Sequence, residues 1–484
     1  MSLAKHSQKN IMVLCFDTLR ADVFYGEYEK TRNKFPNIEK IRNRGTNFIN
    51  AFGEGLPTIP ARRSFFTGVR SFPWRYSYET KGVWPSGKGW HQIPEEQETL
   101  AEIFLINGYE TGLITDTYHM FKPTMNFSRG FSSYEFIRGS ENDNFLNGKV
   151  TEEELAPFVK DTNLRKNASL AQYLANVKER NSSDDWNIFK VFNRSINWIS
   201  RRNKEKPFFL WVDSYTPHEP WDPEEKYIRM HWNNSPETPK KKFIFPIGMK
   251  REDFDSEDEI EYTKALYFGF VSMVDEALGK LITYLEETNE IENTVIIVLS
   301  DHGTELMDHG QFSKSSNRLY THNTRIVFSV IGSEFNKGYV DRLVQAHDLA
   351  PTLIDYLGKE RMKTDGISLL PLLKGEQMRT RDFAIIGWGS NISIRNAQWN
   401  YFINVEDGSN EHLFDILNDP YEKSDLATTN KKMTDYFRRK AEEFLGSSIP
   451  YKFKEKVSDS IAPFRYYYGA TSKDLLPDWD AGFG

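Results

Sequence analysis

Short apolar runs that alternate with helical segments are the feature that most limits how this chain can fold. Residues 11–16, 208–212, 294–299 and 326–331 are almost wholly apolar. Such runs are typical of strands that are buried on both faces of a parallel sheet. Segments with helical periodicity lie between them, and the longest spans residues 262–287. We therefore predict an α/β fold with a large mixed, mostly parallel sheet sandwiched by helices.

The pattern changes near residue 376. Four short segments downstream alternate apolar and polar residues and are separated by turns, which indicates an antiparallel sheet. We predict a main α/β domain at residues 1–375 and a smaller C-terminal α+β domain at residues 376–484. Two polar stretches, at about 116–206 and 228–260, fit the strand and helix alternation poorly and are predicted to be insertions.

Composition excludes some classes of partner. The 484 residues carry a formal net charge of −7 without a long basic run, so a nucleic acid partner is not expected. The longest unbroken apolar stretch, Ile11–Phe16, is far short of the ~20 residues that span a bilayer, so no membrane partner is expected. A single cysteine, Cys15, excludes an intrachain disulfide. The first ten residues lack the apolar core of a signal peptide, which favours a cytoplasmic location unless a native signal was removed. Nothing in the sequence indicates the oligomeric state.

Polar side chains gather where the predicted strands end. Asp17 follows the first apolar run directly, and Ser300-Asp301-His302 follows the third. Open α/β sheets bind ligands at this edge, outside the carboxyl ends of their strands. Pro60 suits the first turn of a helix, which puts Thr58 at or just before a helix N-terminus, where an anion is favoured. Arg62 lies about one turn further along and can reach the same anion.

His218 and Lys314 complete the candidate group. His218 stands between two prolines, shortly after the apolar run at 208–212. Taken singly, each residue of the group has an ordinary explanation, such as a helix cap, a turn, a loop histidine or a surface lysine. Together they place metal-type ligands, an arginine, a lysine and a histidine at one edge of one sheet, which favours an anion-binding active site.

The order of these motifs resembles the sulfatase family of the alkaline phosphatase superfamily. The resemblance covers most of the chain apart from the insertions, and it implies an alkaline phosphatase-like fold and a hydrolase that acts on a small anionic ester. The matching segments are Val13–Asp22, Pro36–Gly45, Thr58–Gly68, Gly108–Gly112, Pro217–Pro220, Ser300–Gly303 with Asp308–Gly310 and Lys314, His347–Leu353 and Leu413–Pro420.

The resemblance implies one divalent metal bound by Asp17, Asp301 and His302, with the oxygen of Thr58 facing it. The family usually has a second acidic residue where Thr18 stands, and often has asparagine where His302 stands. One carboxylate fewer and one imidazole more shift the expected ion from calcium toward manganese, zinc or iron. This version of the site is similar to the phosphonate monoester hydrolase branch.

The resemblance also implies roles for the other site residues. Arg62 would orient the nucleophile, Lys314 would bind the ester oxygens and His218 would protonate the leaving group. The candidates for lining the substrate pocket are Thr117, Tyr118 and His119, where the family's Lys-x-His motif is matched only loosely, and His322. For His322, an ordinary loop histidine is at least as good an explanation.

Thr58 itself leaves the reaction open. Sulfatases carry cysteine or serine at this position and oxidise it to formylglycine, whereas oxidation of threonine would give a ketone, so no formylglycine is expected. A metal-activated threonine alkoxide can still attack, and water must then release the sulfuryl or phosphoryl group. The resemblance favours a sulfate ester, and the residue chemistry favours a phosphodiester or phosphonate ester. A non-catalytic, anion-binding relative is the remaining alternative.

Overall fold

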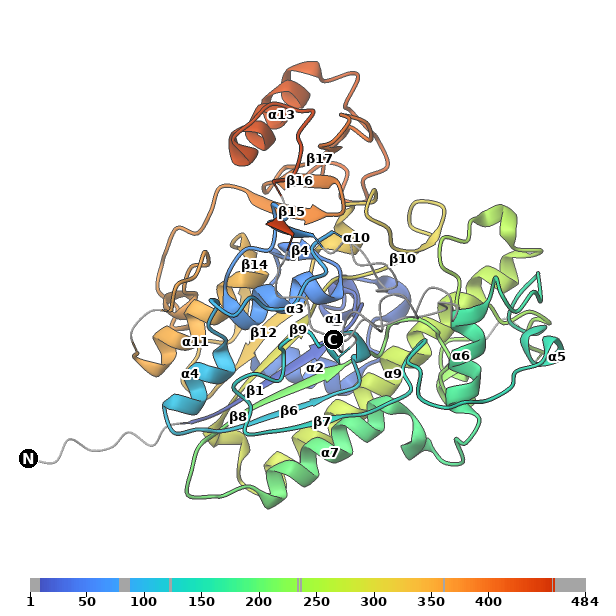
Figure 1. The fold of residues 1–484 in the computed structure, drawn as a ribbon, viewed down its shortest axis with the longest axis horizontal. Coiled ribbons are helices and arrows are strands. Elements are labelled where there is room, and N and C mark those ends of the chain that lie inside the picture. The colour runs from blue at the N-terminus through green and yellow to red at the C-terminus, as the bar shows by residue number, and fades with distance from the viewer. Residues whose placement is uncertain are drawn as a thin grey trace, which may run out of the picture.

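The computed structural model describes residues 9–77, 88–121, 124–232, 235, 237–359, 362–454 and 456–457. Within these residues, eight strands form one twisted central sheet (Figure 1). All of its pairings are parallel except those of β12, so the predicted mostly parallel sheet is confirmed. In sheet order the strands are β13 (Gly338–Val340), β2 (Thr46–Phe48), β12 (Phe328–Ile331), β9 (Thr294–Ser300), β1 (Asn10–Phe16), β8 (Phe208–Ser214), β6 (Glu110–Thr115) and β7 (Ser133–Phe136).

β12 runs antiparallel to both of its neighbours, although its sequence looks like that of the parallel strands. The connection from β9 holds only the short strands β10 (Glu305–Leu306) and β11 (Phe312–Ser313) and the four-residue helix α10 (Thr321–Thr324). A parallel return usually runs through a helix that packs on the sheet, and this connection, which the structure describes throughout, contains no such helix. The chain comes back in the opposite direction.

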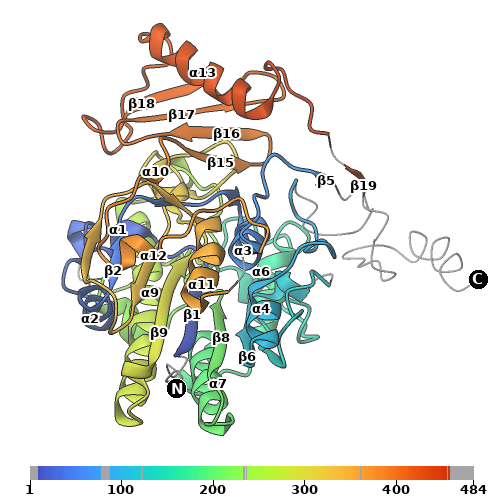
Figure 2. The same ribbon diagram turned by 90° about the vertical axis from the view of Figure 1, so that its left-hand side faces the viewer.

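Helices cover both faces of the sheet, as predicted (Figures 1 and 2). Alternate side chains of β1 point to opposite cores, so that Met12 and Leu14 pack with one set of helices and Ile11 and Val13 with the other. The first set comprises α2 (Pro36–Arg44), α7 (Asn187–Arg201) and α9 (Glu257–Glu287), and the second comprises α3 (Thr58–Thr67), α4 (Leu100–Ile106) and α11 (Leu349–Leu357).

Two of these helices begin inside stretches that were predicted to be insertions. α7 lies within residues 116–206, yet its apolar face joins the core beneath β8. α9 begins at Glu257, within residues 228–260. Ser256 caps it by accepting a hydrogen bond from the N–H of Glu259, and the acidic first turn suits the positive end of the helix dipole. Polar composition concealed both helix starts.

The C-terminal residues form the antiparallel sheet that was predicted, stacked above the large sheet in Figure 2. The helix α13 (Lys431–Leu445) packs on it, and residues 458–484 lie outside the described residues. The strands of this sheet, in order, are β18 (His412–Asp415), β17 (Trp399–Asn404), β16 (Asn391–Arg395), β15 (Ala384–Trp388) and β4 (Gly55–Leu56). The two-residue strand β4 comes from the N-terminal region, pairs in parallel with β15 and ends directly before the Pro57-Thr58 segment.

The remaining elements are short. Among the described residues, none of the helices combines the length and the apolar character that a membrane span requires. The other helices are α1 (Ala21–Phe24), α5 (Glu152–Leu155), α6 (Ala168–Val177), α8 (Glu225–Arg229) and α12 (Leu370–Leu373), and the other strands are β3 (Ala51–Phe52), β5 (Tyr76–Ser77), β14 (Val344–Gln345) and β19 (Lys456–Val457).

Candidate active site

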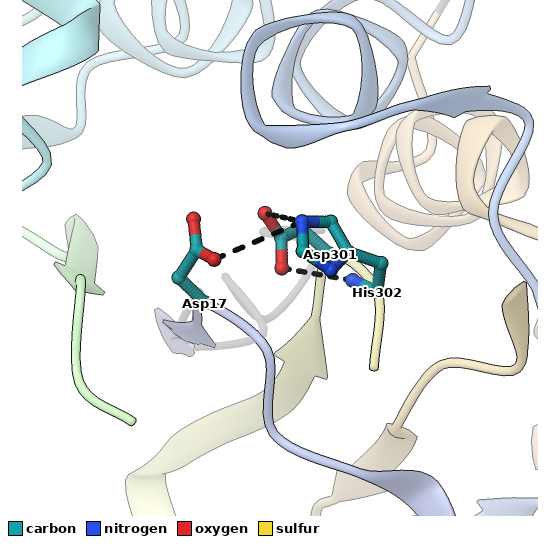
Figure 3. A group of neighbouring side chains, drawn as sticks. All are labelled: Asp17, Asp301 and His302. Atoms are coloured by element: carbon teal, nitrogen blue, oxygen red, sulfur yellow. Dashed lines mark hydrogen bonds and ion pairs between the residues drawn. The ribbon is translucent and has the colours of Figure 1, made fainter. Parts of the chain in front are cut away.

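Two carboxylates and one imidazole meet at the carboxyl ends of β1 and β9. These strands are neighbours, and Phe16 lies opposite Ser300, so the residues that follow emerge at the same edge of the sheet. Asp17, Asp301 and His302 are completely buried there and face one another (Figure 3). One ligand atom from each side chain lies within 4.8 Å of the other two. The structure thus brings together the three residues that were expected to bind a metal.

The donor atoms of this group fit a divalent cation. Oδ1 of Asp17 and Nε2 of His302 are buried without a hydrogen-bond partner among the described residues. The carbonyl oxygen of Gly303 lies 2.8 Å from Nδ1 of His302 and accepts its proton, which leaves the lone pair on Nε2 free. Oδ1 of Asp301 is held by the backbone N–H groups of Thr18 and His302. Unpaired buried polar atoms are costly, and a cation would satisfy both of them.

The electrostatics of the group point the same way. Burial, together with the charge of the neighbouring Asp301, raises the pKa of Asp17 well above its ordinary value. Burial also lowers the pKa of His302 to about 4, so the imidazole is neutral and able to coordinate at neutral pH. Burial disfavours the ionised form of Asp17, and a bound cation would favour it.

Arg62, on α3, links the three carboxylates of the site. Its Nη1 lies 3.1 Å from Oδ2 of Asp17 and 2.7 Å from Oδ2 of Asp301. Its Nε and Nη2 donate to the carboxylate of Asp213, the acidic residue near the end of β8. Three buried carboxylates therefore surround one guanidinium. Asp213 directly follows the apolar run at 208–212, and this position could have marked it as a site residue. We predicted no role for it.

Thr58 is the first residue of α3, and its side chain is buried. Its φ angle of 27° lies in the left-handed region, which β-branched residues avoid. Such backbone strain concentrates at functional sites. The carbonyl oxygen of Thr58 accepts a hydrogen bond from Nη1 of Arg62 at 3.2 Å, and its hydroxyl makes no hydrogen bond to the described residues. Arg62 thus contacts the backbone of the expected nucleophile and not its side chain.

Lys314 and His218 both contact Glu219, a residue for which the sequence predicted no role. Nζ of Lys314 lies 3.0 Å from each carboxylate oxygen of Glu219, and Nδ1 of His218 donates to the Glu219 carbonyl at 2.6 Å. The positive charge of Lys314 opposes the raised pKa of Asp17, and the charges of Lys314 and His218 both add to the lowering of the pKa of His302. Both expected residues therefore lie near the metal-type group, which is Asp17, Asp301 and His302.

Thr117 belongs to the arginine network. Its hydroxyl donates to Oδ1 of Asp213 at 2.6 Å and lies 3.4 Å from Nη2 of Arg62. Thr117 is completely buried and supports Arg62 through these contacts. Its expected role in lining the substrate pocket stays a prediction.

Tyr118 and His119 meet at a second residue that the sequence did not reveal, Glu141. The hydroxyls of Tyr118 and Tyr215 donate to Oε2 of Glu141 at 2.8 and 2.6 Å, and Nε2 of His119 lies 3.7 Å from it. Burial alone would raise the pKa of Glu141, but the hydrogen bond with His119 and the charge of His218 outweigh it and lower the pKa to about 2. Glu141 is therefore an ionised acceptor next to His218.

A cavity of about 30 Å³ opens beside His218. Glu141 and Tyr215 form one side of it, and Arg180 and Trp186, from the predicted insertion at 116–206, form another. The polar segment between β6 and β8 thus supplies part of the wall next to the expected acid.

His322 lies apart from this group. Its Nδ1 is 3.0 Å from Nη2 of Arg20, and Nε2 is 3.5 Å from Oδ1 of Asp308. It lines a different, larger cavity. His322 is the second residue of α10, and its neighbour Arg20 pairs with Asp22 and Asp308.

The chain belongs to the sulfatase family and is a hydrolase of that family: the family model described as Sulfatase matches residues 9–359. An arylsulfatase of Clostridium perfringens is 26% identical over 89% of this chain and 93% of its own length. The multifunctional alkaline phosphatase superfamily protein PehA of Trinickia caryophylli is 25% identical over 87% of this chain and 91% of its own. A phosphonate monoester hydrolase of Agrobacterium radiobacter shares the fold, with a TM-score of 0.66 and 18% identity over 91% of this chain and 95% of that chain.

Proposed function

We propose that the protein is a metal-dependent hydrolase that cleaves a sulfate ester of a small anionic substrate, with the oxygen of Thr58 as the nucleophile. The observation that carries the proposal is the buried group of Asp17, Asp301 and His302 with its two unpartnered donor atoms. A divalent cation held by these residues supplies Lewis-acid stabilisation and lowers the pKa of a bound hydroxyl. Membership of the sulfatase family supports sulfate as the ester group.

Arg62 and Asp213 set the geometry of the nucleophile. The Asp213 carboxylate fixes one edge of the guanidinium, and the other edge holds Asp17, Asp301 and the Thr58 carbonyl. The first residue of α3 is thereby tied to the ends of β1 and β9. A nucleophile held in place in this way needs little reorganisation before attack. In this proposal Arg62 is a positioning residue.

Lys314 binds the non-bridging ester oxygens. The carboxylate of Glu219 holds its ammonium group through two contacts of 3.0 Å, so the cation is kept in one place inside a buried site. A fixed positive charge in a site that excludes water stabilises the negative charge that develops on the transferred group. Glu219 acts through Lys314 and does not need to touch the substrate.

His218 donates the proton to the leaving oxygen. Its Nδ1–H is used by the Glu219 carbonyl, and its Nε2 lies 3.2 Å from the hydroxyl of Tyr215. The hydroxyl of Tyr215 has one proton, which it donates in a hydrogen bond to the carboxylate of Glu141. An ionised carboxylate has no proton to donate in return. The contact with Nε2 is then a hydrogen bond only when the imidazole is doubly protonated, which is the form that a general acid needs. Burial lowers the pKa of His218, while the charges of Glu219 and Glu141 act in the opposite direction, so this form is favoured toward lower pH.

Hydrolysis of a phosphonate ester or phosphodiester by unmodified Thr58 is the second candidate. The specific observations that favour it are the threonine at position 58 and the imidazole of His302 in the metal-type group. The name of PehA, which is multifunctional, and the shared fold of the phosphonate monoester hydrolase agree with a site that is not restricted to sulfate.

The test is a set of aryl ester assays on protein that has been stripped with a chelator and reloaded with single metals. We expect aryl sulfate hydrolysis to return with metal in the wild type and in the exposed control Asp382→Asn, and not in Asp17→Asn. Cleavage of aryl phosphonates alone supports the second candidate. No cleavage of any of these esters by the metal-loaded wild type contradicts both proposals and leaves the non-catalytic alternative.

A further inference from the structure

A cavity of about 710 Å³ lies between the main α/β domain and the C-terminal sheet. In both Figures 1 and 2, α10 lies between α1 and the C-terminal strands that border this region. The walls of the cavity include residues of the segment after β1, of α10 and of the end of β16. Neither the metal-type group nor His218 is among the residues that line it, so it is separate from the candidate active site.

Arg395, at the end of β16, lines this cavity and is 2% exposed. Within the described part of the chain it forms no ion pair, and its Nε has no hydrogen-bond partner. Its other nitrogens make only weak contacts, 3.2 Å to Oγ1 of Thr321 and 3.4 Å to Oγ1 of Thr324. The guanidinium lies over the ring of Phe52, 3.9 Å from its centre. A buried arginine without an anion is an unusual and costly arrangement.

The acidic residues around Arg395 are already occupied. Glu27 forms a double hydrogen bond with Arg325, at 2.5 and 2.8 Å. Asp22 is held in the same way by Arg20, at 2.6 and 2.9 Å. Glu422 accepts from the amide of Asn400 and the N–H of Thr321. Glu29 also lines the cavity, and the charge of Glu422 acts on Arg395, but among the described residues none of these four carboxylates forms an ion pair with Arg395.

The pKa of Arg395 agrees with this geometry. Burial lowers it to about 10; Glu422 acts in the opposite direction, and the positive charge of Arg325 adds to the lowering. The guanidinium remains charged at neutral pH, and its planar set of donors matches two oxygens of a carboxylate, sulfate or phosphate group.

We propose that this cavity binds a small oxyanion carried on a sugar or aryl ring, with the oxyanion on Arg395. The rings of Tyr28 and Tyr421 line the cavity and offer stacking surfaces, while Asn50 and Thr321 offer polar contacts. The volume lies within the range of about 300–1,000 Å³ that is usual for small-molecule sites. This ligand can be a second anionic group of the hydrolysed substrate or a separate molecule.

The cavity is connected to the metal-type group through one short segment. Arg20, three residues after Asp17, contacts His322, and His322 lines the cavity. The backbone of Gly303, next to His302, packs so closely on the His322 carbonyl that an added Cβ would lie 1.9 Å from that oxygen. The two sites are therefore neighbours without sharing a lining residue.

The first test counts bound ions by equilibrium dialysis of the metal-loaded protein with labelled inorganic sulfate. We expect an Arg395-dependent site that Arg395→Gln weakens by roughly 10- to 100-fold, as for loss of a charged hydrogen-bonding group. The matched control Arg379→Gln, which alters an exposed arginine, should bind as the wild type does. Lys314→Gln should remove only a second, active-site ion. A wild type that binds the Arg395-dependent ion but no Lys314-dependent ion would argue against the proposed function and leave this proposal intact.

A result in which Arg395→Gln binds as much sulfate as the wild type overturns the proposal. If Arg395→Gln does not fold, crystals of the wild type are soaked in selenate instead. A selenium peak beside Arg395 supports the site, and the absence of such a peak contradicts it.

The ring of the proposed ligand is tested with glucuronate. Arg395-dependent binding that is tighter than that of inorganic sulfate supports a ring-bearing ligand, and equal or weaker binding contradicts that part. Inhibition of hydrolysis by glucuronate in the wild type, but not in Arg395→Gln, identifies a second anionic group of the substrate as the source; unchanged hydrolysis identifies a separate molecule.

Discussion

Arg62 and Asp213 form an ion pair that is completely buried beside the candidate metal centre. Nε of Arg62 lies 3.0 Å from Oδ2 of Asp213, and Nη2 lies 2.9 Å from Oδ1. With one edge of the guanidinium fixed by Asp213, the opposite edge is aimed at Asp17 and Asp301. Asp213 therefore controls where Arg62 meets the metal-type carboxylates.

Asp213→Asn should destabilise the metal-loaded protein. A divalent ion and Arg62 together balance the three carboxylates of Asp17, Asp301 and Asp213. Removing the charge of Asp213 leaves the buried guanidinium of Arg62 without its bidentate partner. Such losses cost about 3–5 kcal/mol, whereas breaking an exposed pair costs less than about 1 kcal/mol. Thermal unfolding of the metal-loaded variants measures this, with Asp382→Asn as the control, since its partner Arg379 is exposed. Equal losses in the two variants would contradict the assigned importance of the Arg62–Asp213 pair.

Thr58→Ala should lower turnover by orders of magnitude, because no neighbouring hydroxyl can replace a covalent nucleophile. Thr58→Ser keeps the oxygen and should retain measurable activity. Quenched reactions analysed by mass spectrometry should show the transferred group on the peptide that contains residue 58 in wild type and in Thr58→Ser. Near-normal activity in Thr58→Ala would leave residue 58 as a helix start only.

Thr58→Cys separates sulfate from phosphate. It restores the Cys-x-Pro-x-Arg pattern that sulfatases oxidise, so co-expression with a maturation enzyme should produce formylglycine. Aryl sulfatase activity should then rise if the pocket is built for sulfate. If mass spectrometry verifies the conversion and no sulfate ester is cleaved faster, the result favours a phosphodiester or phosphonate ester as the substrate.

His218→Ala should slow esters with poor leaving groups by about 10²–10⁴-fold and affect nitrophenyl esters much less, since nitrophenolate needs little protonation. Tyr215→Phe removes the hydroxyl that contacts Nε2 of His218 and should give a smaller loss with the same dependence on the leaving group. Rates across an aryl ester series, measured as kcat/KM, test both. A loss that is uniform across the series would remove His218 from the role of acid.

Asp116 predicts a pH effect on stability. Burial raises its pKa to about 6, although the Tyr215 N–H and the Ser140 hydroxyl donate to it. Its unfolded pKa is about 3.9. The stability that protonated Asp116 contributes is thus complete below pH ~4 and lost as the pH rises through about 6.

Asp116→Asn keeps a neutral side chain at every pH. Its stability relative to wild type should therefore rise between pH ~4 and pH ~6 by up to about 3 kcal/mol and then level off. Thermal unfolding of both proteins across this range measures the difference. A difference that does not change with pH would contradict the raised pKa.

The fold could be predicted where burial alone decides structure. Strands such as β1 and β9 are apolar on both faces, and that pattern is specific to the interior of a sheet. The start of α9 was missed because its first turn is acidic, and an acidic run reads equally well as solvated surface. The direction of β12 was missed because it depends on what lies between the strands and not on the strand itself.

The site could be predicted where a residue directly follows a strand or opens a helix, as Asp17 and Thr58 do. Glu141 could not, because its role depends on two tyrosines and a histidine that approach from other segments. Arg395 is the same kind of case. Its sequence position is ordinary, and only the folded chain shows that its guanidinium is buried and forms no ion pair with the described residues.

The metal centre is tested most directly by a metal titration of chelator-stripped protein by calorimetry, with elemental analysis of the loaded form. We predict that the wild type binds one divalent ion per chain at this site and that Asp17→Asn and His302→Ala each lose it, while Asp382→Asn binds as the wild type does. Binding that is unchanged in Asp17→Asn and His302→Ala, or no binding by the wild type, would contradict the claim that Asp17, Asp301 and His302 form a metal centre.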